Sequence, residues 1–224
     1  MSLVTASTVV ITGGHGSLAS HMATVFRERA PHWTVLTPSR SELDVTDAES
    51  IKDFFAAHPC DLLIANAGKV HDQPLLTTAE STWNELLDVN LRGAAWCAKQ
   101  ASRAMIKKRE GHILFLSSFS AISPPAGQVA YASAKAGLLG LTKALAQELG
   151  SANIRVNAIF PGFLENAMTE HVSPARKEQV VQAHCLKRCN TQSAVADFVF
   201  ALHQLLPHTS GQVFSLDSRI APWT

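Results

Sequence analysis

Short runs of apolar residues alternate with longer amphipathic stretches along nearly the whole chain. The runs are rich in Val, Ile, Leu and Phe and show little polar alternation, which is typical of parallel strands buried on both faces. They predict strands at Thr8–Thr12, Thr34–Thr37, Asp61–Ala65, His112–Ser117, Arg155–Ile159 and Gln212–Leu216. The fold class that follows is α/β, a doubly wound parallel sheet with helices on both faces.

Helix-start signals fall between the predicted strands. Thr46–Glu49 and Thr77–Glu80 have the spacing of a capping box, and Ser173 precedes a proline at the first helical position. The two longest helices are expected at about Thr82–Lys108 and Val129–Gly150.

One crossover in this pattern is too short to hold a helix. Arg40 is followed almost at once by Asp44, whereas parallel neighbouring strands need about a dozen connecting residues. We therefore expect the sheet to be shortened after the second strand, with at most a vestigial edge strand at Leu43–Val45. The next helix is expected over Asp47–Ala57.

A glycine-rich turn joins the first strand to the first helix. Gly14, Gly16 and Ala19 match the G-x-G-x-x-A form of the dinucleotide fingerprint, in which the turn and the helix N-terminus bind a pyrophosphate. This predicts a single-domain Rossmann fold over residues 1–224. The candidate cofactor contacts in this turn are Thr12, Gly13, Gly14, His15, Gly16, Ser17 and Leu18.

The end of the second strand indicates which dinucleotide is bound. NAD sites usually carry an acidic residue there, about twenty positions after the glycines, but this chain has Ser39 and Arg40. A guanidinium and a hydroxyl favour a 2′-phosphate, so NADP(H) is expected rather than NAD(H). His15 either adds a further donor or is simply an exposed loop residue.

Candidate catalytic residues gather at the same edge of the predicted sheet. Tyr131 is the only tyrosine, and Lys135 lies one helical turn after it, where an ammonium would lower the pKa of the phenol. Ser118 follows the strand His112–Ser117. Residues Asn66, Ala67, Gly68, Pro161 and Gly162 follow two other strands, and Asn90 lies in a long helical segment.

These motifs resemble, in order and over essentially the whole length, those of the short-chain dehydrogenase/reductase family. Ala65–Gly68 resembles its NNAG element, and Asp88–Asn90 carries its helix asparagine. Ser117–Ser118 and Tyr131–Gly137 resemble its active-site serine and YxxxK motif, Asn157–Gly162 its NxxxPG turn, and Ser210–Asp217 its closing strand.

The resemblance implies an oxidoreductase that transfers a hydride between nicotinamide and a carbonyl or secondary alcohol. Tyr131 would donate or accept the proton, Ser118 would bind the substrate oxygen, and Lys135 would bind the nicotinamide ribose and lower the tyrosine pKa. Asn90 would hold a water that links Lys135 to solvent. Asp44 and Val45 would contact the adenine.

Four departures from the family pattern stand out. Ser17 and Ala19 replace glycines of the usual phosphate loop, and Asn166 replaces the threonine that normally anchors the nicotinamide carboxamide. Asparagine still donates and accepts hydrogen bonds. Asp217 is followed by serine where the family has DGG. The missing helix after Arg40 removes part of the adenosine wall.

The resemblance is nearest to 3-oxoacyl reductases, so the expected substrate is a small-molecule ketone or alcohol, including an acyl thioester. The segments expected around it are Val70–Leu76, Phe119–Gln128 and Phe163–Leu186, whose apolar residues line a pocket or merely cover the sheet. Arg109, in a basic run that ends a helix, stands where such reductases carry a residue facing the carrier protein.

The main alternative to a reductase is an idle NADP-binding sensor on the same fold. An epimerase is disfavoured, because this chain has no room for the larger C-terminal substrate region of such enzymes.

Composition narrows the expected partners. Nineteen basic and eighteen acidic residues leave a net charge of +1, so no global field favours nucleic acid or a membrane surface. No signal segment or apolar span is present, and a cytoplasmic location is expected. Cys185 and Cys189 lack a second ligand pair, so no metal is expected. The family resemblance implies a homodimer or homotetramer.

Overall fold

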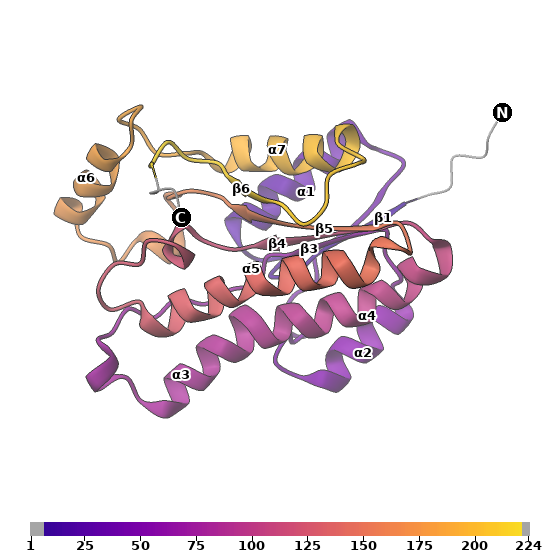
Figure 1. The fold of residues 1–224 in the computed structure, drawn as a ribbon, viewed down its shortest axis with the longest axis horizontal. Helices are drawn as coiled ribbons and strands as arrows, with labels where there is room; N and C mark the ends of the chain where they lie inside the picture. Colours follow the sequence, from indigo (N-terminus) through magenta and orange to yellow (C-terminus); the bar gives the residue numbers. More distant parts are fainter. Residues whose placement is uncertain (1–6, 221–224) are drawn as a thin grey trace.

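A parallel sheet forms the centre of the molecule in the computed structural model, which describes residues 7–220 (Figure 1). The sheet has six strands in the order β2-β1-β3-β4-β5-β6. The strands are β1 (Thr8–Ile11), β2 (Thr34–Leu36), β3 (Leu62–Ala65), β4 (Gly111–Leu116), β5 (Ile154–Phe160) and β6 (Val213–Ser215). All five neighbouring pairs are parallel, as the sequence predicts.

Helices cover both faces of this sheet. They are α1 (Ser17–Arg29), α2 (Ala48–Ala57), α3 (Glu80–Leu87), α4 (Gly93–Lys108), α5 (Val129–Gly150), α6 (Pro174–Ala183) and α7 (Gln192–Leu205). Figure 1 shows α1 and α7 together on one face and α2, α4 and α5 on the other, with α6 beyond the end of the sheet. The predicted doubly wound Rossmann arrangement is therefore confirmed.

Each strand divides its side chains between two apolar cores. Val10 of β1 packs toward α2, α4 and α5, whereas Val9 and Ile11 pack toward α1 and α7. All three side chains are fully buried. This explains why the strand sequences show no polar alternation, because neither face of a central strand meets water.

The chain after β2 departs from the usual fold, as its short length predicts. The vestigial strand expected at Leu43–Val45 is wrong: this segment is irregular and pairs with no strand of the described chain, and β2 is the edge of the sheet. Leu43 instead enters the core. The carbonyl oxygen of Val45 lies so close to α4 that a Cβ on Gly93 would be 2.5 Å from it.

The helix that begins next is capped differently from the prediction. The side chain of Asp47, not Thr46, accepts hydrogen bonds from the backbone N–H groups of Glu49 and Ser50. The Thr46 hydroxyl donates instead to Asp44. The second capping box, at Thr77–Glu80, is also wrong, because Ala79 is the N-cap of α3. Ser173 does cap α6, as predicted.

The long helix expected at Thr82–Lys108 is interrupted. One π-helical turn, Asp88–Arg92, separates α3 from α4. Such a turn inserts an extra residue into the helix, and it is frequent at functional sites. Here it contains the buried Asn90. The other long helix, α5, has the bounds that the sequence predicts.

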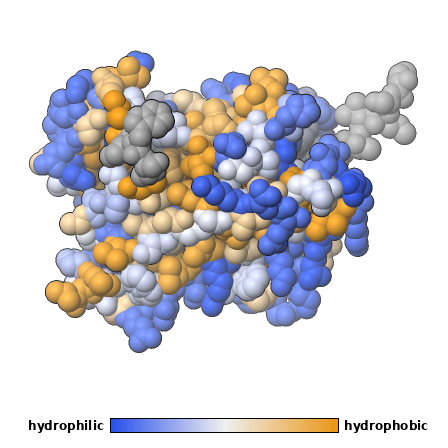
Figure 2. Space-filling model, viewed as in Figure 1, coloured by the Kyte–Doolittle hydropathy of each residue, from blue (hydrophilic) through white to orange (hydrophobic). Residues whose placement is uncertain are grey.

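Apolar and polar side chains are intermixed over the face drawn in Figure 2. Trp96 on α4 and Val129 at the start of α5 are 43% and 41% exposed in the single chain. The expected homodimer or homotetramer stays a prediction. Over residues 7–220, no helix is both long enough and apolar enough to cross a bilayer.

Candidate active site

A cavity of about 910 Å³ opens where strands β1, β3, β4 and β5 end. Its volume lies near the upper end of the range of roughly 300–1,000 Å³ that is usual for ligand sites. The cavity includes the point where the strand order reverses, between β1 and β3, and open α/β sheets bind their ligands there. The glycine-rich turn lines one end of it, and Tyr131 and Arg219 line other parts.

The glycine-rich turn is shaped for close approach of a ligand. Gly13 has a φ of +70°, a conformation that favours glycine. A Cβ on Gly14 would lie 2.3 Å from the carbonyl oxygen of Thr37, so no side chain fits there. Gly16 is the N-cap of α1 and makes no side-chain cap hydrogen bond, which leaves the first N–H groups of the helix for an anion. All six residues Gly13–Leu18 line the cavity.

Thr12 supports this turn from behind and does not line the cavity. Its hydroxyl oxygen accepts hydrogen bonds from the backbone N–H groups of Asn66, at 3.0 Å, and Ala67, at 2.9 Å. Nδ2 of Asn66 donates back to the Thr12 carbonyl at 3.0 Å. The ends of β1 and β3 are thereby held together, and Asn66, Ala67 and Gly68 line the cavity between them.

The turn after β2 brings only part of the predicted 2′-phosphate site to the cavity. Arg40, Asp44 and Val45 line it, but Ser39 does not. The Ser39 hydroxyl pairs with Ser41, and its backbone N–H donates to the Glu42 carboxylate at 2.8 Å. Glu42 is an acidic neighbour that sequence reasoning did not weigh.

Arg40 is itself paired within this turn. Its Nε donates to Asp44 Oδ2 at 3.0 Å, although 80% of its side chain is exposed. Hydrogen bonds from Thr46, and then from Arg40, hold the pKa of Asp44 below its usual value. Asp44 is therefore a carboxylate with partners already in place.

Asn90 reaches the site from the π-helical turn, and it is also absent from the cavity wall. Its Nδ2 donates to the carbonyl oxygens of Leu86, at 2.9 Å, and Lys69, at 2.8 Å, while its Oδ1 accepts from the Lys69 N–H at 3.2 Å. A Cβ on Gly68 would lie 3.1 Å from this Oδ1 and 3.6 Å from Lys135 Nζ. Asn90 thus fixes the loop that separates it from Lys135.

Tyr131 and Lys135 both lie in the wall of the cavity, on one face of α5. Lys135 Nζ donates to the Leu116 carbonyl at 2.8 Å and lies 5.7 Å from the centre of the Tyr131 ring. Burial lowers the pKa of Lys135 to about 8. The two side chains are neighbours, as the spacing predicts, but the amine is directed to a backbone carbonyl.

The predicted lowering of the tyrosine pKa is wrong for this structure. Burial raises the pKa of Tyr131 above its usual value, the nearby Ser118 hydroxyl lowers it in part, and the Asp72 carboxylate raises it further. A phenol in this environment keeps its proton at neutral pH. The sequence shows which groups are adjacent, but it does not show how much water the fold removes from them.

Ser118 lies at the end of β4 and caps a short 3-10 turn, Phe119–Ala121. Its hydroxyl oxygen accepts from the Ser120 N–H at 3.1 Å, which leaves the hydroxyl proton for another acceptor. The neighbouring Ser117 hydroxyl donates to the Lys135 carbonyl at 2.8 Å. This bond joins β4 to α5 and so places Ser118 and Tyr131 on one cavity.

The segment after β5 closes the cavity from the opposite side. Pro161, Gly162 and Asn166 all line it. Gly162 has a φ of +88°. Oδ1 of Asn166 accepts from the Met168 N–H at 2.9 Å and so caps the short turn Ala167–Thr169.

Comparisons with known proteins agree with this geometry. A family model described as enoyl-(acyl carrier protein) reductase matches residues 7–218. A 3-oxoacyl-(acyl-carrier-protein) reductase FabG of Aquifex aeolicus (strain VF5) is 35% identical over 217 residues, covering 94% of this chain and 86% of that protein. A crystal structure of a Burkholderia thailandensis oxidoreductase of the short-chain dehydrogenase/reductase family superposes with a TM-score of 0.86 at 26% identity, covering 96% of this chain and 92% of that one.

The chain belongs to the short-chain dehydrogenase/reductase family. It is therefore an oxidoreductase of the kind that acts on CH–OH and C=O groups with a nicotinamide cofactor. Another FabG relative, from Thermotoga maritima, is 35% identical over 181 residues, with 78% of this chain and 74% of that protein covered. The dinucleotide fits the residues present, because the uncapped α1 N-terminus and the glycines leave space for its phosphates.

This short-chain dehydrogenase/reductase has four polar cavity residues that sequence reasoning did not single out, although all but Arg219 lie in the segments expected around the substrate. Asp72, Gln128, His171 and Arg219 line the substrate end together with apolar residues. Gln128 Nε2 donates to Asp72 at 2.9 Å, and His171 lies 3.4 Å from the same carboxylate. These side chains come from loops that follow different strands, so no local sequence motif identifies them as a group. Among the described residues, no three His, Cys, Asp or Glu side chains are placed to hold a metal.

Two other expectations about the substrate end of this reductase fold need correction. Arg109 is the left-handed C-cap of α4, and its guanidinium donates to the Ser151 carbonyl. It precedes β4, so it lies at the edge of the sheet opposite Ser118. Within the expected segment Phe119–Gln128, the apolar residues Ile122, Pro124 and Pro125 do not line the cavity, whereas Phe163, Leu164 and Met168 of the segment Phe163–Leu186 do.

Proposed function

We propose that this chain is an NADPH-dependent ketoreductase whose substrates include 3-oxoacyl thioesters. The observation that carries the proposal is that Ser118, Tyr131 and Lys135 line the same cavity as the glycine-rich turn Gly13–Leu18. One ligand lying along that cavity reaches both the phosphate-binding end and the phenol. The FabG relatives at 35% identity support the choice of substrate.

Tyr131 is the proton donor in this proposal. Since burial raises its pKa, the phenol is protonated at neutral pH and suited to give its proton to a carbonyl oxygen that gains negative charge. The Ser118 hydroxyl donates a hydrogen bond to the same oxygen and stabilises the charge there. The nicotinamide cofactor, when bound, supplies the hydride.

Lys135 and Asn90 act around this pair. With a pKa of about 8, Lys135 is largely an ammonium at neutral pH, and in this proposal its charge offsets only part of the burial that disfavours the phenolate remaining after proton transfer. Asn90 is a positioning residue, because its amide clamps the backbone at Lys69 beside Lys135. Its role in a water relay stays part of the proposal.

The cofactor contacts proposed here follow the cavity wall. The phosphates are held by residues Gly13–Leu18, and the 2′-phosphate that distinguishes NADPH by Arg40, with His15 on the neighbouring turn. Asp44, Val45, Asn66, Ala67 and Gly68 border the adenosine half, and Pro161, Gly162 and Asn166 the nicotinamide half. Thr12 and Ser39 support the two turns from outside the cavity.

The test is an assay of the purified protein with NADPH and a panel of carbonyl compounds, followed by the loss of nicotinamide absorbance. The panel includes a 3-oxoacyl thioester, an isolated ketone and a 2-enoyl thioester, because the matching family model is described as an enoyl reductase. We expect reduction of the 3-oxoacyl thioester. Tyr131→Phe should lower kcat at least about 100-fold, the usual contribution of a general acid.

NADPH binding to Tyr131→Phe, measured by fluorescence titration, is the control and should stay close to wild type. Turnover of the enoyl thioester alone would replace the ketoreductase with a C=C reductase. Binding of NADPH without turnover of any compound would indicate an idle cofactor sensor. A Tyr131→Phe variant with wild-type kcat would remove Tyr131 from the mechanism.

A further inference from the structure

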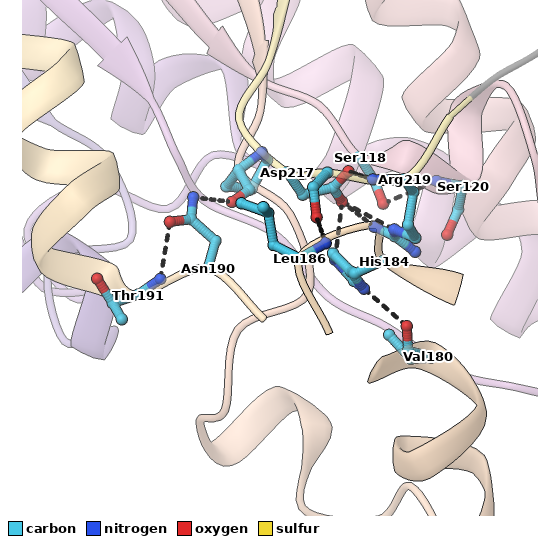
Figure 3. A network of polar contacts seen from close by, with 11 residues as sticks. Ser118, Ser120, Val180, His184, Leu186, Asn190, Thr191, Asp217 and Arg219 are labelled. Atoms are coloured by element: carbon cyan, nitrogen blue, oxygen red, sulfur yellow. Dashed lines mark hydrogen bonds and ion pairs between the residues drawn. The ribbon is translucent and has the colours of Figure 1, made fainter. Parts of the chain in front are cut away.

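Arg219 reaches the substrate end of the cavity from the segment that follows β6. It lines the cavity, and its side chain is only 16% exposed. Figure 3 shows it beside Ser118, with Asp217 and His184 on its other side. Arg219 stands two residues after Asp217, in the part of the chain where the family pattern has glycines.

The guanidinium is held rigidly along one edge. Its Nε donates to Asp217 Oδ2 at 2.8 Å, and its Nη2 donates to the same oxygen. The Arg219 backbone N–H donates to Asp217 Oδ1 at 3.0 Å, and the Asp217 side chain is completely buried. The Arg219 Cζ also lies 3.9 Å from the centre of the ring of Phe119, which is the residue directly after Ser118.

The opposite edge of the guanidinium is open. An arginine has five N–H donors in a fixed fork, and Asp217 accepts from Nε and from one N–H of Nη2. Over the described residues 7–220, no atom accepts a hydrogen bond from Nη1. A fork that is fixed on one edge and open on the other is preorganised to bind an oxygen acceptor in the cavity.

Neighbouring segments fix the position of this arginine. His184 and Arg219 form an antiparallel bridge, and Ser218 accepts from the N–H groups of Cys185, at 3.0 Å, and Leu186, at 3.2 Å. Figure 3 shows how His184 and Arg219 both meet Asp217. Gly162 leaves room for Asp217, since a Cβ there would lie 2.9 Å from the Asp217 Cβ. The position of Arg219 is therefore fixed jointly by its own segment after β6 and by the segments of the chain between β5 and α7 that pack against it.

We propose that Arg219 determines substrate specificity by donating hydrogen bonds to a second oxygen acceptor of the substrate, close to the carbonyl that is reduced. Ser118 and Arg219 both line the cavity, and the guanidinium lies over the ring of Phe119, the residue that follows Ser118. The substrate class is a 3-oxo compound, whose second acceptor is a thioester carbonyl or a carboxylate. This inference rests on the proposed ketoreductase function.

The experiment compares kcat/KM for three substrates: a 3-oxobutanoyl thioester of N-acetylcysteamine, 3-oxobutanoate, and cyclohexanone as an isolated ketone. The main variant is the double substitution Asp217→Asn with Arg219→Gln, which avoids leaving a buried carboxylate without a partner. Arg219→Lys keeps the charge and removes the fork. Arg176→Gln, on α6 and outside the cavity wall, is the matched control.

We expect the double variant to lose at least about tenfold more kcat/KM for a 3-oxo substrate than for cyclohexanone, as the loss of a hydrogen bond from a charged donor predicts. Arg219→Lys should show the same bias more weakly, and Arg176→Gln should show none. A bias confined to the thioester identifies its carbonyl as the acceptor, and one confined to 3-oxobutanoate identifies the carboxylate. Melting temperature and NADPH binding check the fold of each variant.

Equal losses for all three substrates would overturn the inference, because a purely structural Arg219 affects every reaction alike. If the double variant does not fold, the absence of a bias in Arg219→Lys decides against the inference in the same way. A wild-type protein that reduces none of the three compounds removes the proposed function and this inference with it. If the wild-type protein turns over the substrates but the Arg219 variants show no bias, the proposed function stands and only this inference is overturned.

Discussion

Charged residues of both signs share the short turn that ends at the adenosine side of the cavity. Arg40 is paired with Asp44, and the Glu42 carboxylate accepts from the Ser39 N–H. The guanidinium would attract a 2′-phosphate bound beside this turn, and the two carboxylates would repel it. The balance at single residues therefore decides which dinucleotide is preferred.

Arg40→Ala should weaken NADPH binding by about tenfold, a modest value because the side chain is exposed and screened by salt. NADH binding should change much less, since NADH lacks the 2′-phosphate. Dissociation constants from fluorescence titration measure both effects. The matched variant Glu42→Gln should strengthen NADPH binding, and equal weakening of NADPH and NADH by Arg40→Ala would contradict the contact.

The sequence predicts the identity of the residues at the catalytic end but not their states. Ser118, Tyr131 and Lys135 are recognisable because their spacing is fixed by one strand and one helix. The pKa values of Tyr131 and Lys135 depend on how much water the cavity excludes, which no local pattern records. The proposed role of Arg219 could not be predicted from a local motif, because its guanidinium is placed against Phe119, a hundred positions earlier in the chain.

Among the helices, the π-helical turn Asp88–Arg92 connects the candidate active site to the short chain after β2. It contains Asn90, and the first residue after it is Gly93. The Val45 carbonyl packs directly on Gly93. The strands and α5 could be predicted from their apolar patterns, whereas this interruption could not, because the sequence remains helix-like throughout.

Gly93→Ala should destabilise the protein by about 1–3 kcal/mol, the usual cost of overpacking. The added methyl would lie 2.5 Å from the Val45 oxygen, and that atom belongs to the backbone. The matched variant is Gly140→Ala in α5, where a Cβ meets nothing within 4 Å. It should stabilise the helix by about 0.5–1 kcal/mol. Urea unfolding measures both, and equal effects would contradict the close contact.

Across the whole molecule, the end of the sheet opposite the cavity holds a second polar cluster. His112 and His203 approach each other at 3.2 Å between their Nδ1 atoms, and Asn157 lies 3.1 Å from the other ring nitrogen of His112. Burial, and then the positive charge of Arg155, lowers the pKa of His112 well below its usual value and that of His203 to about 4. Both rings are neutral in the folded protein at neutral pH.

Stability should therefore fall as the pH drops below about 6.5, where histidines of the unfolded chain take up protons that the folded chain refuses. The contribution of His203 is fully present above pH 6.5 and is lost progressively down to its folded pKa of about 4. Between pH 7 and pH 5 this amounts to about 2 kcal/mol. Urea unfolding at several pH values measures the slope.

His203→Gln should reduce this pH dependence, because glutamine keeps a hydrogen-bonding group and does not titrate. His208→Gln, at an exposed position in the turn after α7, is the control and should keep the wild-type slope. Identical slopes for His203→Gln and wild type would exclude the buried cluster as the origin of the acid sensitivity.

Within residues 7–220, no strand lies beyond β2, and this bears on how the protein behaves at high concentration. An outermost strand exposes N–H and C=O groups that can recruit a strand of another molecule, and long flat borders are the dangerous ones. Here both borders, β2 and β6, have three residues each, and a proline follows β2 at position 38. Edge strands this short offer few unpaired backbone groups, so we expect the protein to resist edge-to-edge pairing at high concentration.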